Sequence, residues 1–139
     1  MNPVVRQASC VAIGERAVLI EGAPGTGKSS LALALIDRGA ALVGDDGVTL
    51  ESRDGTLWAS PPPNTANLLE IRNVGIVSMP ARSARVALIV ALDRAAPRFV
   101  DTAPMREICG VAIPAVSLYP DSAALPLRAE WALRIHGAD

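Results

Sequence analysis

Residues 22–29 (GAPGTGKS) combine residue types and a spacing that suit the binding of a phosphate chain. Two glycines five positions apart are followed by a lysine and a serine, which is the phosphate-loop pattern. Glycines let consecutive backbone N–H groups turn toward phosphate oxygens, the ammonium of Lys28 neutralises the outer phosphates, and the hydroxyl of Ser29 is a ligand for Mg²⁺. The residues expected to contact a nucleotide are Gly22, Ala23, Pro24, Gly25, Thr26, Gly27, Lys28, Ser29 and Ser30.

The residues on both sides of this loop predict the elements that must hold it. Residues 17–20 (AVLI) form a short apolar run, typical of a buried strand in a parallel sheet. Residues 30–38 are rich in leucine and alanine and predict a helix that ends at Gly39. Because strand, loop and helix follow one another in the required order, we interpret the loop as a nucleotide-binding loop and not as an ordinary glycine-rich turn.

A second candidate for chemistry is the acidic pair Asp45 and Asp46, which follows a predicted strand at residues 41–43. One short helix separates this strand from the first, so the two are expected to run parallel, and ligands collect outside the carboxyl ends of such strands. One carboxylate of the pair can hold Mg²⁺ while the other accepts a proton from an attacking hydroxyl. Aspartates are also common in helix caps and turns, but the position of this pair favours function.

Glu70 and Arg72 are charged residues within an otherwise apolar and irregular stretch, residues 68–77. Strand alternation would place both on one face, with Leu69 on the other. The pattern alone is equally consistent with a functional role and with a solvated ion pair at an exposed edge. Gly75 indicates a tight backbone at this point.

The rest of the chain predicts further strands and a second helix. We expect a β-hairpin with an Asp-Gly turn within residues 48–58, an extended loop at 61–64, a central strand at 85–92, a short strand at 113–118, and a helical segment at 122–135 interrupted by Pro126. These elements predict an α/β fold with a mixed sheet and flanking helices. A chain of this length is expected to form a single domain, residues 1–139.

Composition excludes several classes of partner. The net charge is −1 without a basic cluster and only 3% of residues are aromatic, so a nucleic-acid partner is not expected. The longest apolar run, residues 86–92, is too short to cross a membrane, and the first residues lack the features of a signal peptide. Cys10 and Cys109 have no metal-ligand spacing and are expected to be free thiols, which suits a cytoplasmic protein.

Together, these motifs resemble the catalytic domain of HPr kinase/phosphorylase, a bacterial enzyme that phosphorylates a serine of the phosphocarrier protein HPr and can reverse the reaction. In residues 22–46, the loop, the helix and the acidic pair have the family's spacing. Residues 70–76 (EIRNVGI) are similar to the family signature Glu-(Val/Ile)-Arg-Gly-x-Gly-Ile, and residues 113–133 are similar to the end of short, proteobacterial-type members. The resemblance implies a P-loop-containing fold of the HPr kinase type.

The function that this resemblance implies is that of an ATP-dependent protein-serine kinase. Its substrate would be HPr or an HPr-like phosphocarrier in the regulation of carbohydrate metabolism, with ATP and Mg²⁺ as cofactors and phosphorylase activity as a second expectation. The family forms hexamers, so a homo-oligomer is also implied.

Roles for individual residues follow from the resemblance by position. Lys28 would contact the transferred phosphate, and Ser29 and Glu70 would hold Mg²⁺. Asp46 would accept the proton of the serine hydroxyl, with Asp45 beside it at the metal. In addition, Arg72 would act as a catalytic residue within the signature segment, residues 69–78.

The chain departs from the family pattern at three points. Gln7 stands where a histidine is usual and cannot titrate, and Asn73 replaces a glycine but tolerates a left-handed backbone. Longer family members carry an Arg-Pro-Gly-Arg-Asn loop and an N-terminal domain, and residues 1–139 match neither. The candidates to supply the missing cation are Arg72, Arg82, Arg85 or a neighbouring subunit.

Two alternative functions belong to other classes. An ATP-binding regulatory module without phosphotransfer would account for Gln7 and for the absent arginine loop. A P-loop kinase of small metabolites is the second alternative, although the sequence shows no obvious lid or substrate domain.

Overall fold

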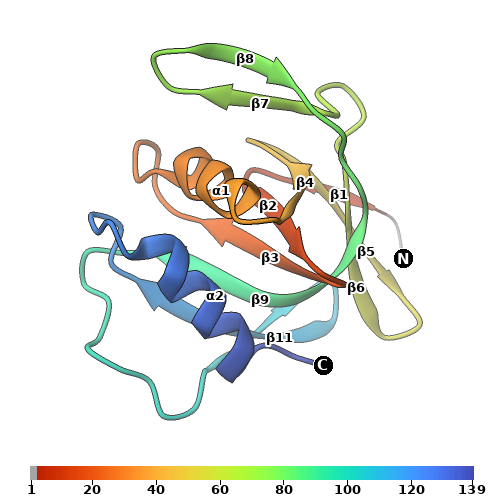
Figure 1. The fold of residues 1–139 in the computed structure, drawn as a ribbon. Helices are drawn as coiled ribbons and strands as arrows, with labels where there is room; N and C mark the ends of the chain where they lie inside the picture. The colour runs from red at the N-terminus through yellow and green to blue at the C-terminus, as the bar shows by residue number, and fades with distance from the viewer. Residues whose placement is uncertain (1–2) are drawn as a thin grey trace.

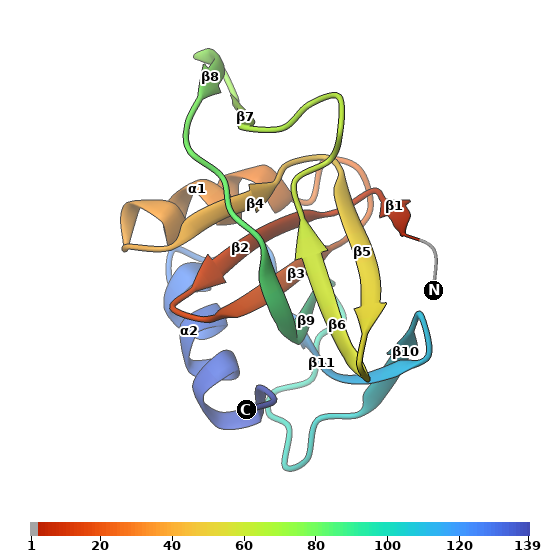
Figure 2. The ribbon, with the colours of Figure 1, turned by 90° about the vertical axis from the view of Figure 1, so that its right-hand side faces the viewer.

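A curled nine-stranded sheet and two helices form the body of the structure, a computed structural model that describes residues 3–139 (Figure 1). The sheet consists of β1 (Val4–Arg6), β2 (Ser9–Ile13), β3 (Arg16–Glu21), β4 (Ala41–Gly44), β5 (Val48–Arg53), β6 (Thr56–Ser60), β9 (Ala84–Leu92), β10 (Met105–Ile108) and β11 (Val111–Leu118). The helices are α1 (Lys28–Asp37) and α2 (Leu125–His136). A separate two-stranded ribbon, β7 (Leu68–Ile71) and β8 (Gly75–Ser78), projects from the body (Figure 2).

Strand β9 lies at the centre of the sheet and pairs with three other strands. It runs parallel to β3 along one edge, with Arg85 opposite Arg16 and Ala91 opposite Glu21. Along its other edge it pairs first with β6 in the antiparallel sense and then with β11 in the parallel sense. The predicted central strand at residues 85–92 is therefore confirmed, and the sheet is mixed as expected.

Side chains of the central strands are buried on both faces of the sheet. Leu19 and Ile89 belong to one core cluster, which the curled strands β5, β6, β10 and β11 help to enclose. Val18 and Leu88 belong to a second cluster, which lies against α1 and α2. Burial on both faces explains why these strands have continuous apolar sequences. Both helices cover one face of the sheet, and the curl of the sheet itself covers the other.

The two helices differ in how well their boundaries were predicted. Helix α1 ends just before Gly39, as expected. The predicted interruption of the second helix at Pro126 is wrong, because this proline lies in the first turn of α2. There the missing N–H has no intrahelical partner to lose and the fixed φ suits the helix.

The hairpin of β5 and β6 has the predicted Asp-Gly turn. Asp54 and Gly55 both have positive φ, 52° and 78°, as a type I′ turn requires. Arg53 pairs with Thr56 at the end of the ladder, so the turn fixes the register of the two strands.

Three features of the fold differ from the sequence-based expectations or were not predicted. Residues 68–77 form the regular ribbon of β7 and β8 instead of an irregular segment. Strands β1, β2 and β10 were not predicted. Strand β4 has the same direction as β3, as expected, but β2 lies between them and is antiparallel to both.

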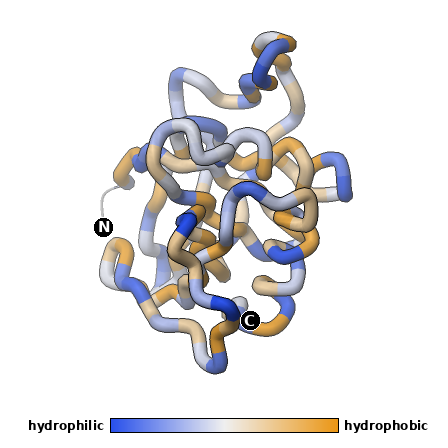
Figure 3. Tube along the Cα trace, turned by 90° about the vertical axis from the view of Figure 1, so that its left-hand side faces the viewer, coloured by the Kyte–Doolittle hydropathy of each residue, from blue (hydrophilic) through white to orange (hydrophobic). Residues whose placement is uncertain are grey.

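Neither helix within residues 3–139 has the length and apolar character needed to cross a membrane. In the projecting ribbon, strongly hydrophilic and strongly hydrophobic residues lie next to one another along the chain (Figure 3). Val74 and Ile76, which are 74% and 67% exposed, are the most exposed of its apolar residues.

Replacement of Ile89 by alanine is expected to lower the free energy of unfolding by about 2–5 kcal/mol, because Ile89 is fully buried on the central strand and its removal leaves a cavity. Urea unfolding followed by circular dichroism measures the change. Ile135→Ala is the matched control, since this isoleucine is 67% exposed on α2 and should change the stability by less than about 0.5 kcal/mol. Equal effects of the two substitutions would contradict the assignment of β9 to the core.

The two cysteines are expected to differ in reactivity. Cys10 is fully buried, and burial raises the pKa of its thiol, so the unreactive protonated form persists from about pH 7 to about pH 9. Cys109 is only partly buried. A disulfide-exchange reagent should therefore label Cys109 in the folded protein and reach Cys10 only after unfolding, which mass spectrometry can follow. Rapid labelling of Cys10 in the folded state would contradict this placement.

Candidate active site

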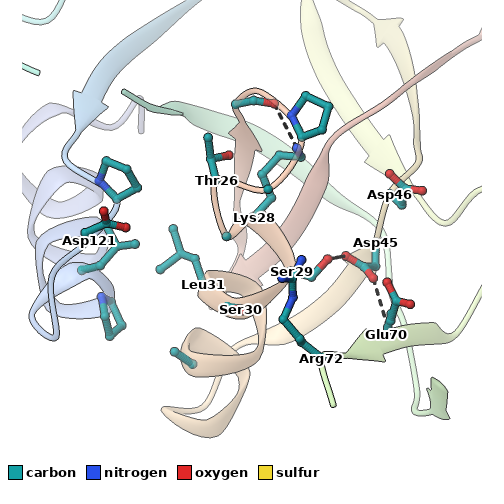
Figure 4. Close-up of a pocket in the computed structure, with 18 of the residues that line it drawn as sticks. Thr26, Lys28, Ser29, Ser30, Leu31, Asp45, Asp46, Glu70, Arg72 and Asp121 are labelled. Atoms are coloured by element: carbon teal, nitrogen blue, oxygen red, sulfur yellow. Dashed lines mark hydrogen bonds between the residues drawn. The ribbon is translucent and has the colours of Figure 1, made fainter. Parts of the chain in front are cut away.

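The phosphate loop lies between the end of β3 and the start of α1 (Figure 4). Gly27 caps the helix with a φ of +97°, a left-handed conformation that favours glycine. The ammonium of Lys28 donates hydrogen bonds to the carbonyl oxygens of Gly22, at 2.9 Å, and Ala23, at 3.3 Å. The side chain of this lysine therefore lies folded over the loop that a phosphate chain would occupy.

Gly22 is required by the close packing of the loop on the sheet. A Cβ atom at this position would lie 2.5 Å from Oγ1 of Thr26 and 3.2 Å from Cβ of Leu92. The Thr26 hydroxyl is itself fixed, because it donates a hydrogen bond of 2.7 Å to the carbonyl of Ala23. A larger residue at position 22 would displace the loop from β9.

Ion pairs fix the chain where it enters the loop. Glu21, the last residue of β3, is 15% exposed and lies between two arginines. Its Oε2 atom accepts from Arg6 of β1 at 2.5 Å, and its Oε1 atom accepts from Arg106 of β10 at 2.6 Å. Two strands that are far apart in the sequence, β1 and β10, thus hold the start of the phosphate loop.

Asp45 is the buried hydrogen-bond acceptor of the site. Its Oδ1 atom accepts from the hydroxyl of Ser29 at 2.5 Å and from the hydroxyl of Ser9 at 2.9 Å. Its Oδ2 atom accepts from the backbone N–H of Glu70 at 3.1 Å. The carboxylate is only 7% exposed and joins β2, α1 and β7 in one network.

Asp46, the second member of the acidic pair, has a different environment. It is exposed, lines the cavity beside the loop, and has a φ of 57°, which turns the chain between β4 and β5. The structure thus separates the two carboxylates: Asp45 holds neighbouring groups in place, while Asp46 faces the open cavity (Figure 4).

The ribbon of β7 and β8 forms one side of the cavity. Leu69 is fully buried, whereas Glu70 is exposed and lines the cavity, as strand alternation predicts. Arg72 also lines the cavity, but it does so from the turn that follows β7. At the tip of the ribbon, Asn73 has a φ of 68°, so asparagine does adopt the left-handed backbone expected at this departure from the signature.

The cavity has a volume of about 980 Å³ and collects nearly all of the predicted residues. Every predicted loop residue except Ala23 lines it, together with Gln7, Asp45, Asp46, Glu70 and Arg72. The sequence did not indicate the segment between β11 and α2, which also lines the cavity with Pro120, Asp121, Ser122 and Ala123. The signal was present, because this segment follows the carboxyl end of a strand that runs parallel to β9.

Only one of the three arginines that were candidates for a catalytic cation lies at the cavity in the described residues. Arg72 lines the cavity. Arg82 donates to the carbonyl of Gly14, and Arg85 donates to the carbonyl of Asp139, so neither side chain reaches the site. Within this chain, Arg72 is the candidate that remains.

The donor groups of the site fit a metal ion that arrives with a nucleotide. Within residues 3–139 there is no group of three or more His, Cys, Asp or Glu side chains placed to hold a metal by themselves. Mg²⁺ commonly takes one or two carboxylates and completes its coordination with phosphates and water. Ser29, Asp45 and Glu70 provide oxygen donors of this kind beside the loop.

The fold and the site define a phosphate-loop domain with an acidic pair at the end of a neighbouring strand. A family model, the HPr Serine kinase C-terminal domain, matches residues 4–120. The chain belongs to this family.

Individual relatives agree with this assignment. HPr kinase/phosphorylase of Streptococcus thermophilus (strain ATCC BAA-491 / LMD-9) is 51% identical over 63 residues, which are 45% of this chain and 20% of the relative. HPr kinase/phosphorylase of Streptococcus pneumoniae (strain Hungary19A-6) is 36% identical over 115 residues, which are 73% of this chain and 37% of the relative. These matches therefore span well under half of either curated relative.

A solved structure, that of the Hpr(Ser) kinase/phosphatase from Coxiella burnetii, has a similar fold. The TM-score is 0.82 with 28% sequence identity, over 94% of this chain and 88% of that chain.

Replacement of Asp45 by alanine is expected to lower the free energy of unfolding by about 1–3 kcal/mol, because it leaves the buried hydroxyl of Ser9 and the N–H of Glu70 without their acceptor. Chemical denaturation measures the loss. Asp101→Ala is the control, since Asp101 lies exposed in the connection between β9 and β10 and should change the stability by less than about 0.5 kcal/mol. An Asp45→Ala protein as stable as the control would show that the network does not hold the site together.

Proposed function

We propose that the chain is an ATP-dependent protein-serine kinase that acts on HPr or an HPr-like phosphocarrier. The observation that carries this proposal is that the phosphate loop, the acidic pair and the ribbon with Glu70 and Arg72 all line one cavity. Family membership supports it, as do the relatives named HPr kinase/phosphorylase and the structural neighbour named Hpr(Ser) kinase/phosphatase.

The phosphate chain of ATP would lie on the loop, with the backbone N–H groups and Lys28 as its donors. In the structure, the ammonium of Lys28 is bound only to carbonyl oxygens of the loop, so a nucleotide can exchange those neutral acceptors for charged phosphate oxygens. The dipole of α1, which begins at Lys28, adds a partial positive charge at the same point.

Asp46 would act as the general base for the serine hydroxyl. Its carboxylate is exposed to the cavity, where an incoming side chain can reach it, whereas the carboxylate of Asp45 is already bound by three donors. Deprotonation by Asp46 makes the serine oxygen a better nucleophile toward the γ-phosphorus, and the ADP oxygen leaves on the opposite side.

Ser29, Asp45 and Glu70 would hold Mg²⁺ together with the phosphates, and the ion would neutralise charge on the transferred group. Arg72 would add a second cation at the same side of the cavity. The hydrogen bond from Ser29 to Asp45 orients the serine hydroxyl and leaves the lone pairs of its oxygen available to the ion.

Transfer of labelled γ-phosphate from ATP to purified HPr tests the proposal. The Asp46→Asn variant should lower kcat by about 10²–10⁴-fold, because the general base is lost, while the Kd for ATP changes by less than about threefold. A parallel reaction of phosphorylated HPr with inorganic phosphate shows whether the phosphorylase direction also operates.

Asp54→Asn is the matched control for this experiment. Asp54 is also an exposed aspartate with positive φ, but it lies in the hairpin turn of β5 and β6 and does not line the cavity. It should leave transfer unchanged. A wild-type chain that binds ATP normally but transfers no phosphate to HPr would refute the kinase proposal and favour a regulatory module.

A further inference from the structure

The cavity extends past the phosphate loop on the side away from the acidic pair. There it is bounded by an apolar wall, which we define as Leu31 and Ala34 of α1, Pro120, and Leu125 and Pro126 at the start of α2. In Figure 4, Asp121 lies on one side of the loop, while Asp45, Asp46, Glu70 and Arg72 lie on the opposite side. The two halves of the cavity therefore differ in chemical character.

The apolar wall is rigid because the core holds it. Leu31 and Leu125 are only 2% and 7% exposed, and both belong to the core cluster between the helices and the sheet. Arg38, which follows α1, and Glu130 of α2 form an exposed ion pair, with both carboxylate oxygens 2.9 Å from the guanidinium Nε. The buried packing of Leu31 and Leu125 holds this wall in place without a ligand, which lowers the entropic cost of binding a flat ring.

The size of the cavity exceeds what a phosphate chain needs. Its volume of about 980 Å³ is at the upper end of the range of roughly 300–1,000 Å³ for small-molecule sites. Such sites typically combine an apolar surface for the ring system with a few polar groups that orient it. Asp121, held by Arg94 at 2.5 Å, supplies a hydrogen-bond acceptor at the edge of the apolar wall.

We propose that the apolar wall is the nucleobase subsite of the nucleotide and that the segment between β11 and α2 closes it, an assignment that rests on the proposed binding of ATP by the phosphate loop. The base of ATP packs against Leu31 and Ala34, and Asp121 accepts hydrogen bonds from the nucleoside. The γ-phosphate then points toward Asp46 and Glu70. The nucleotide has one orientation in the cavity, fixed at its base end by aliphatic packing.

The test compares ATP with inorganic tripolyphosphate, which has the phosphate chain but no nucleoside. Isothermal titration calorimetry on the full chain should show at least about tenfold tighter binding of ATP. Ala34→Phe fills the subsite and should weaken ATP binding by about tenfold or more, while the affinity for tripolyphosphate changes by less than about twofold.

A second variant and a control show whether any loss of binding in Ala34→Phe comes from misfolding of the variant protein. Ala123→Phe should have the same selective effect, because Ala123 is exposed at the rim of the subsite and its replacement disturbs no core packing. Ala112→Phe is the control, since Ala112 is exposed on β11 outside the cavity and should leave both affinities unchanged.

The possible outcomes separate this inference from the proposed function. Equal wild-type affinities for the two ligands, or equal losses of both in Ala34→Phe and Ala123→Phe, would overturn the nucleobase subsite and leave the phosphate site in place. A wild-type chain that binds neither ligand would overturn the subsite and the proposed kinase function together. A selective loss of ATP binding in both variants supports the subsite.

Discussion

The carboxylate of Asp45 accepts hydrogen bonds from three elements that are far apart in the sequence: from β2 through Ser9, from α1 through Ser29, and from β7 through Glu70. A buried carboxylate is stable only when its oxygen atoms are satisfied in this way. Because the partners include the last residue of the phosphate loop and the ribbon, the same interaction positions both sides of the cavity. The geometry of the candidate site therefore depends on a residue that is itself almost completely buried.

The order of strands around β9 explains why this network can form. The parallel pairing of β3 with β9 and of β9 with β11 brings the carboxyl ends of three strands to one edge of the sheet. The loop after β3 and the segment after β11 consequently meet across one cavity. Burial of the central strands on both faces, with helices on one side and the curled sheet on the other, makes that edge a rigid support.

Local sequence signals predicted the parts of the molecule that depend on short-range physics. The loop at residues 22–29, the strand at 85–92 and the Asp-Gly turn at residues 54 and 55 were predictable because glycine conformation, apolar runs and turn chemistry act within a few residues. Local sequence signals were weaker for strands whose formation depends on pairing or contacts with distant parts of the chain. Strand β10 has only four residues, and the ribbon of β7 and β8 is stabilised by a hydrogen bond to Asp45 that no local pattern encodes. The apolar wall was not predicted for the same reason, since α1 and α2 meet only in the folded chain.

The ion pairs around Glu21 have a consequence for the order in which the chain folds. Glu21 and Arg106 are separated by 85 positions in the sequence, so their contact closes one of the longest loops in the molecule. Long-range contacts of this kind form late, because the entropy of loop closure is lost before the contact is gained. The N-terminal third of the chain contains every residue of the phosphate loop, yet the start of that loop becomes fixed only once the hairpin of β10 and β11 has docked. We therefore expect the candidate site to be among the last parts of the domain to reach its native form.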